Sequence, residues 1–162
     1  MMEPRPNGRA IIVATLAIGL WLSIIPLPEW ARWARPEWVA LILIYWVLAL
    51  PHRVGVGVAF TVGLVLDLVE GAPPGENALA LMLVAYLGLI LYQRMRMYTP
   101  WQQAGIVFVL IGLNQLLCHW VQTLTTKVTP TMLFLLPALI SALLWPTMLP
   151  LLRKIRRTFA VT

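Results

Sequence analysis

The sequence contains little cysteine and little charge. Its 162 residues include a single cysteine, Cys118, and only 11% of them are Asp, Glu, Lys or Arg. One cysteine excludes a disulfide framework, and no Cys/His pair has the spacing of zinc ligands. A soluble domain carries about 25% charged residues. The composition therefore excludes an ordinary soluble domain, a disordered chain and a coiled coil.

Acidic residues are the scarcest charged group: there are six, and Asp67 is the only aspartate. An intramembrane aspartyl protease needs two aspartates, because one acts as acid while the other acts as base. The sequence also lacks a Gly-x-Ser-x-Gly turn, a His-Glu-x-x-His motif and a glycine-rich loop that could cradle phosphate. We therefore expect no enzyme activity, no cofactor and no bound metal.

Hydrophobic residues, in contrast, make up 60% of the chain, and the mean hydropathy is +0.84. A transmembrane helix needs about 20 apolar residues, and prolines favour helix ends. These features predict an all-α integral membrane protein, with residues 1–162 forming one transmembrane domain. The six predicted transmembrane helices cover residues 10–28, 38–50, 54–69, 78–92, 101–125 and 131–152.

The second and third predicted helices are short for a membrane span. At about 1.5 Å per residue, the second covers only about 20 Å of a hydrocarbon core of about 30 Å. A re-entrant hairpin is one alternative, but it would leave Arg53 in the membrane at a cost of at least about 2.5 kcal/mol. We favour two complete helices joined by a tight inner turn, Pro51-His52-Arg53.

The basic residues predict the orientation of the helices. With the N-terminus inside, nine of the twelve Lys and Arg residues lie on the cytoplasmic side and three on the outer side. Lys and Arg near the ends of membrane spans are enriched on the cytoplasmic side of the membrane. We therefore expect both termini to lie in the cytoplasm. The net charge of +6 then reflects orientation and contact with membrane lipid, and not nucleic-acid binding.

The first outer loop combines aromatic and basic side chains, which allows two interpretations. It is either a short segment that lies in the membrane interface or a contact surface for a periplasmic partner. The residues concerned are Trp30, Arg32, Trp33, Arg35 and Trp38.

The third predicted helix carries small residues and Asp67 at a spacing of four: Gly55, Ala59, Gly63, Asp67 and Gly71. Residues four apart lie on nearly the same helix face, and small residues allow another helix to approach closely. A carboxylate inside a membrane must be paired, protonated or near water. Asp67 is therefore either a hydrogen-bond clamp onto a neighbouring helix or loop amide, or part of a functional polar pocket or partner contact.

The fifth predicted helix has a polar stripe formed by Gln115, His119 and Gln122, which lie at positions i, i+4 and i+7. The predicted topology places this stripe in the same leaflet as Asp67. We hypothesise that Gln115 or His119 hydrogen-bonds near Asp67. In the sixth helix, Pro146 and Pro150 predict a bend.

The residues together resemble the MreD family of rod shape-determining membrane proteins, in the form found in Gram-negative rods. The most specific stretches are residues 35–54, which begin Arg-Pro-Glu-Trp and end Leu-Pro-His-Arg-Val, and Gly63-Leu-Val-Leu-Asp67-Leu. Trp101-Gln-Gln103, Leu144-Trp-Pro146 and Phe159-Ala-Val161 also resemble that family.

The resemblance implies a non-catalytic protein of the bacterial inner membrane. Such a protein belongs to the elongasome, which builds side-wall peptidoglycan and so maintains rod shape. Its implied partners are MreC directly, and MreB, RodA and the penicillin-binding transpeptidase of RodA directly or indirectly. Homo-oligomers within the MreC complex are also possible. The implied six-helix fold is similar to the substrate-binding subunits of energy-coupling-factor transporters.

Two functional hypotheses follow from these observations. The first is a membrane scaffold that binds MreC and controls peptidoglycan synthesis. The second is a small-molecule-binding, transporter-like membrane subunit. A polar cavity lined by Asp67 and the Gln115/His119 stripe would favour the second hypothesis.

Overall fold

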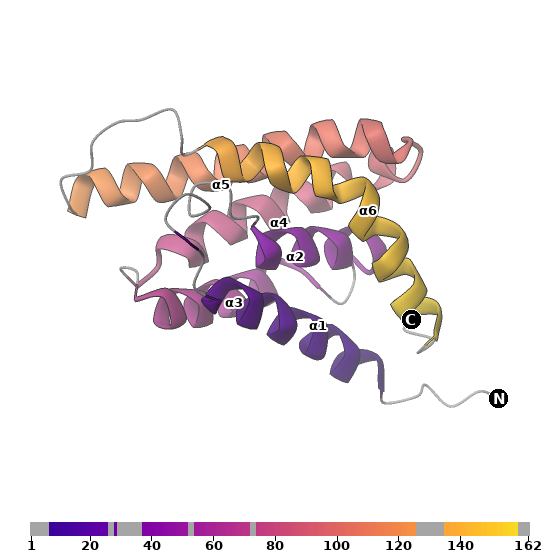
Figure 1. Cartoon of the computed structure of the whole chain (residues 1–162), viewed down its shortest axis with the longest axis horizontal. Coiled ribbons are helices and arrows are strands. Elements are labelled where there is room, and N and C mark those ends of the chain that lie inside the picture. The colour runs from indigo at the N-terminus through magenta and orange to yellow at the C-terminus, as the bar shows by residue number, and fades with distance from the viewer. Residues whose placement is uncertain are drawn as a thin grey trace.

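The computed structural model describes residues 7–25, 28, 37–51, 54–71, 74–125 and 135–158, and within them the chain is all-helical (Figure 1). This part of the fold prediction is confirmed. The helices are α1 (Asn7–Ile24), α2 (Trp38–Ala49), α3 (Val56–Glu70), α4 (Glu76–Met95), α5 (Pro100–Thr125) and α6 (Leu136–Thr158).

Three of these helices are long and apolar enough to cross a membrane: Glu76–Met95, Pro100–Leu124 and Leu136–Thr158. The apolar stretches of α1 and α2, Arg9–Ile24 and Trp38–Ala49, are shorter. The boundaries of α6 differ most from the prediction, since the helix continues through the basic residues to Thr158. Lys and Arg are good helix formers, so their charge does not end the helix.

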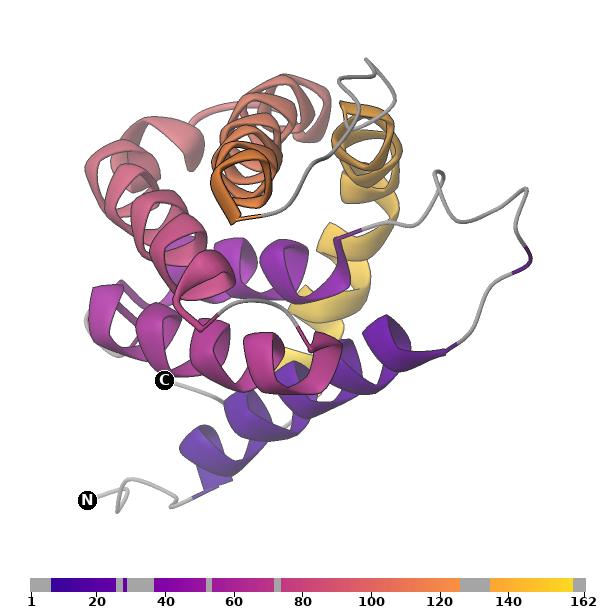
Figure 2. The same ribbon diagram turned by 90° about the vertical axis from the view of Figure 1, so that its left-hand side faces the viewer.

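Helix α2 occupies the centre of the bundle. It packs against α1, α4, α5 and α6, and Figure 2 shows it surrounded by these helices. Ten of its twelve residues, Val39 through Leu48, are buried. A helix that is apolar on all sides is typical of a protein interior. Because protein encloses α2, its short length need not match the thickness of a bilayer.

Two indole groups are held by buried hydrogen bonds in this interior. The Trp46 Nε1–H donates to Thr15 Oγ1 at 2.8 Å, which ties α2 to α1. The Trp145 Nε1–H donates to Gln103 Oε1 at 3.1 Å, and Gln103 Nε2 donates to the Met95 carbonyl at 2.6 Å. Gln103 therefore links α4, α5 and α6.

Helices α3 and α4 form the most extensive helix pair. Gly63 of α3 lies directly against Ala78 of α4. The connection between the two helices contains Gly71 with φ of 69° and Gly75 with φ of 98°. Positive φ values favour glycine, so these two glycines permit the turn that brings α4 back along α3.

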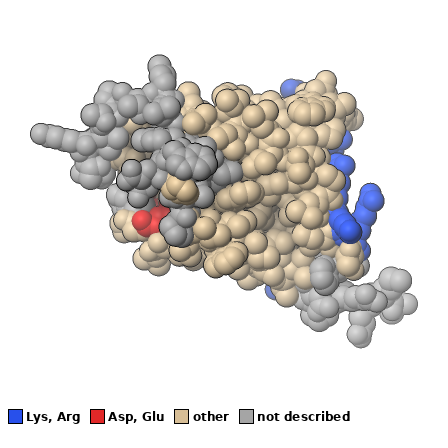
Figure 3. Space-filling model, in the orientation of Figure 1, with Lys and Arg blue, Asp and Glu red and all other residues tan. Residues whose placement is uncertain are grey.

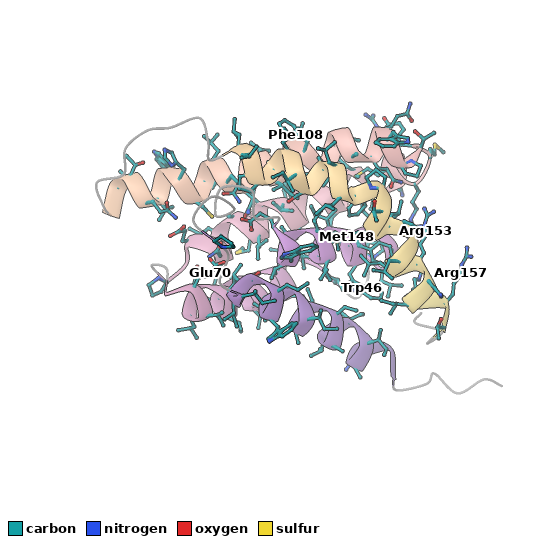
Figure 4. All side chains as sticks on the ribbon, in the orientation of Figure 1. Trp46, Glu70, Phe108, Met148, Arg153 and Arg157 are labelled. Carbon is teal, nitrogen blue, oxygen red and sulfur yellow. The ribbon has the colours of Figure 1, made fainter. Side chains whose placement is uncertain are left out.

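Helix α6 bends in its second half (Figure 1), in the region of its internal prolines Pro146 and Pro150. A proline inside a helix removes a hydrogen bond and crowds the preceding turn, as the sequence predicted. The bend carries Arg153 and Arg157 across the end of the bundle (Figure 4).

Charge separates along the length of the bundle (Figures 3 and 4). Within the described residues, the acidic side chains lie at one end, the acidic end, and the basic side chains lie at the other, the basic end. The acidic end comprises Glu37 before the start of α2, Asp67 and Glu70 in the last turn of α3, and Glu76 at the start of α4. The basic end comprises Arg9 in the first turn of α1, Arg94 and Arg96 at the end of α4, and Arg153, Lys154, Arg156 and Arg157 in the last turns of α6.

Candidate functional site

Asp67 lies at the acidic end, where its carboxylate joins α3 to the start of α4. The side chain is only 2% exposed. Its Oδ2 accepts a hydrogen bond from the Gly75 amide at 2.9 Å. Its Oδ1 accepts from the Asn77 backbone amide at 2.8 Å and from Asn77 Nδ2 at 3.0 Å. Asp67 thus forms a clamp on loop and helix amides.

The position of this clamp is electrostatically favourable. The first amides of a helix have no partner within the helix, and the helix N-terminus carries partial positive charge. Gly75 is the N-cap residue of α4, and Asn77 lies in its first turn. The Asp67 carboxylate therefore caps α4 from a neighbouring helix, because the N-cap residue Gly75 has no side chain that could do so.

Asn77 extends the network from Asp67 to α5. Its Nδ2 also donates to Glu70 Oε2 at 3.2 Å, and its Oδ1 accepts a weak hydrogen bond from Cys118 Sγ at 3.6 Å. Both Asn77 and Cys118 are buried. The lone cysteine thus takes part in a polar contact between α4 and α5.

The polar stripe of α5 reaches the acidic end but contacts other partners than predicted. Gln115 donates to Glu37 Oε1, and Gln122 donates to Glu76 Oε1 at 2.8 Å. His119 is half-buried. Among the described residues, neither Gln115 nor His119 bonds to Asp67 itself, because the Gly75 amide and Asn77 already donate to its carboxylate.

Five polar residues of this network were not predicted as site residues from the sequence: Glu37, Glu70, Glu76, Asn77 and Ser141. The Ser141 Oγ accepts a hydrogen bond from the Glu37 amide at 2.9 Å, which connects α6 to the start of α2. Glu76 and Asn77 follow a Gly-rich turn and open a helix, and that position could have indicated partners for a nearby carboxylate. Ser141 lies within an apolar run and gives no comparable signal.

The small-residue stripe of α3 divides into an internal and an open part. Ala59 and Gly63 are buried, and Gly63 is in contact with α4. A Cβ atom at Gly55 or at Gly71 would meet nothing within 4 Å. Gly71 serves instead as the left-handed C-cap of α3.

Several predicted contact residues lie outside the described residues: Trp30, Arg32, Trp33, Arg35, His52 and Arg53. Of the outer-loop set, Trp38 is half-buried as the first residue of α2. Of the inner turn, Pro51 is half-buried just after α2.

An open groove runs between α1 and α3. Its volume is about 680 Å³, and its walls are mostly apolar. Leu16 and Leu20 of α1 and Val58 and Val62 of α3 line it, together with Gly57. Helices α1 and α3 make few direct contacts with each other. The groove therefore presents apolar surface that the other described helices leave uncovered.

The model of the family described as rod shape-determining protein MreD matches residues 5–155. This chain belongs to the MreD family. It is 34% identical over 146 residues to the rod shape-determining protein MreD of Haemophilus influenzae, and the match covers 90% of each chain. No solved structure matches the chain.

Membership of the MreD family gives the protein a role in bacterial cell shape, within the rod-shape system. MreD is a shape-determining, membrane-associated family and not a known enzyme family. In the described part of the chain, no three His, Cys, Asp or Glu side chains are placed to hold a metal ion. Neither the α1–α3 groove nor a smaller pocket at the basic end is lined by Asp67 or the α5 stripe.

Proposed function

We propose that the protein is a non-catalytic membrane scaffold of the elongasome that binds MreC and thereby controls side-wall peptidoglycan synthesis. In this proposal all six helices form a single domain in the inner membrane, and both termini lie in the cytoplasm. The separation of charge between the two ends of the bundle supports this orientation, because basic residues accumulate on the cytoplasmic side of membrane proteins.

The α1–α3 groove is the observation that carries the scaffold proposal. Helices associate in lipid through close packing of small and apolar side chains, and not through a hydrophobic driving force. The groove is apolar, about 680 Å³ in volume, and contains Gly57. A Cβ atom at Gly57 would meet nothing within 4 Å, so a partner helix can approach the α3 backbone there. We assign this groove to the transmembrane helix of MreC.

The groove gives less support to the alternative, a transporter-like subunit that binds a small molecule. Small-molecule sites combine apolar walls with a few convergent polar groups. The polar side chains in the groove lining are those of Arg9 and Thr61, which come from different helices. The larger polar network surrounds Asp67, where the side chains already bond to one another.

Co-purification with MreC tests the proposal. We expect the full chain to retain MreC in mild detergent, and Gly57→Leu to reduce that retention about tenfold, because overpacking at a helix contact costs about 1–3 kcal/mol. Gly105→Leu on α5 is the matched control, since Gly105 is also exposed and has open space around its Cβ position.

Two outcomes would contradict this proposal. Failure of MreC to co-purify while both proteins remain folded would overturn the scaffold function. Equal retention by the Gly57→Leu and Gly105→Leu variants would overturn the groove as the docking site.

A further inference from the structure

A small polar pocket lies at the basic end of the bundle, between α2, α4, α5 and α6. Its volume is about 110 Å³, well below the roughly 300–1,000 Å³ of sites that enclose a drug-sized molecule. A water molecule takes about 30 Å³ in the liquid, so the pocket has room for a group of only a few heavy atoms. Its polar lining consists of Tyr45, Arg96, Gln103, Arg153 and Arg156.

The pocket is rich in hydrogen-bond donors. Arg96 donates to the carbonyls of Leu48 and Ala49 and so holds the end of α2. Arg153 has an exposed side chain and forms no hydrogen bond to the described residues. An arginine offers five N–H donors and no acceptor. The guanidinium groups therefore favour an acceptor, and above all an anion.

Tyr45 supplies a buried donor to the same pocket. The side chain is only 3% exposed. The Arg156 guanidinium lies beside the hydroxyl oxygen, but the hydroxyl proton has no acceptor among the described residues. The neighbouring arginines cannot accept its proton. Buried polar groups normally have a partner, so the hydroxyl proton indicates that a further acceptor belongs in the pocket.

The charge around the pocket and its depth in the membrane indicate which acceptor it binds. The described carboxylates all lie at the opposite end of the bundle, so none of them neutralises this pocket. Tyr98 and Trp101 are exposed beside it, at the connection between α4 and α5. Aromatic rings of this kind lie at the headgroup level of a membrane, which is where phosphate groups are found.

We propose that this pocket binds the phosphate group of an anionic phospholipid, with Arg153 and Tyr45 as its donors. Guanidinium groups bind phosphate through paired, charge-assisted hydrogen bonds, and basic pockets between transmembrane helices hold acidic headgroups. The site shares no residue with the α1–α3 groove. Lipid binding at this pocket can therefore be tested independently of MreC binding.

Lipid retention by the purified full chain, read by native mass spectrometry, tests this site. Three ligands are compared: phosphatidylglycerol, phosphatidylcholine and inorganic phosphate. We expect phosphatidylglycerol to bind at least about tenfold more tightly than the other two, since its headgroup combines net negative charge with membrane anchoring. Equal binding of the two lipids overturns the proposal. Inorganic phosphate that binds as tightly as phosphatidylglycerol overturns the lipid as the source.

Three variants separate the pocket from general surface charge. Arg153→Gln should weaken phosphatidylglycerol binding about tenfold or more, the usual effect of losing a hydrogen bond to a charged group. The matched control is Arg157→Gln, which removes the same charge from an exposed residue outside the pocket lining, and it should bind normally. Equal losses in the two variants would overturn a specific site.

Tyr45→Phe should weaken binding about threefold with little change in thermal stability, because the hydroxyl proton has no acceptor among the described residues. Unchanged binding by both Arg153→Gln and Tyr45→Phe would also overturn the proposal.

Discussion

A Cβ atom added to Gly63 of α3 would stand 2.4 Å from the Cα atom of Ala78 in α4, and 2.6 Å from its amide nitrogen. Both are backbone atoms, so the neighbour cannot move aside as a flexible side chain could. The α3–α4 contact therefore depends on a glycine at this position. The same contact sets the separation at which the Asp67 carboxylate reaches the start of α4.

Gly63→Ala should destabilise the protein by about 1–3 kcal/mol, because the added methyl group overpacks a backbone contact. The control is Gly57→Ala on the same helix, where the new methyl group has open space. Alanine favours a helix over glycine by roughly 0.5–1 kcal/mol, so the control should be neutral or stabilising. Thermal unfolding in detergent measures both, and an unchanged Tm for Gly63→Ala would contradict the contact.

Asp67→Ala should cost about 2–4 kcal/mol, because it leaves the Gly75 and Asn77 backbone amides without an acceptor near the start of α4 and removes one of the two acceptors of Asn77 Nδ2. Stability should fall at the start of α4 in particular, as well as for the protein as a whole. Hydrogen exchange at the amides of Gly75 and Asn77 should become faster, while exchange in the buried middle of α2 changes only with overall stability. Unaltered exchange at Gly75 would show that Asp67 does not cap α4.

Gln103→Leu should destabilise the protein by about 1–3 kcal/mol, because the buried Trp145 indole N–H loses its acceptor. Gln93→Leu, at an exposed position of α4, is the control for the same change of side chain. Thermal unfolding compares the two variants. Equal Tm values would mean that the link from α5 to α6 contributes little.

Cys118 should react with a maleimide only after the protein unfolds. The thiol is 8% exposed and faces Asn77 between α4 and α5. Labelling should therefore follow the unfolding curve, and Asp67→Ala should shift the onset of labelling to lower temperature. Rapid labelling of the folded wild-type chain would contradict the buried position.

The sequence predicted the helices well but could not predict where α2 lies. Residues 38–50 are apolar on every side, which fits a helix facing lipid as well as one enclosed by protein. Only the packing of α1, α4, α5 and α6 around it distinguishes these environments. The bend of α6 was predictable because proline acts on its own helix, whereas the centre of a bundle depends on all the helices together.

The candidate site was predicted in part for a similar reason. Spacing along α3 placed Gly63 and Asp67 on one face, and that face meets α4. The partners of Asp67 were not predictable from the α5 stripe, because a turn with two positive-φ glycines brings Asn77 to the carboxylate first. Gln115 and Gln122 then pair with Glu37 and Glu76 instead.

The central position of α2 has a consequence for the order in which the protein is made. Ser141 of α6, which accepts the hydrogen bond from the Glu37 amide, is synthesised 104 residues after Glu37. During that interval α2 has left the ribosome, but one of the helices that enclose it does not yet exist. Its apolar surface must meanwhile face lipid, a chaperone or the insertion machinery, and it reaches its final surroundings only when α6 folds over it.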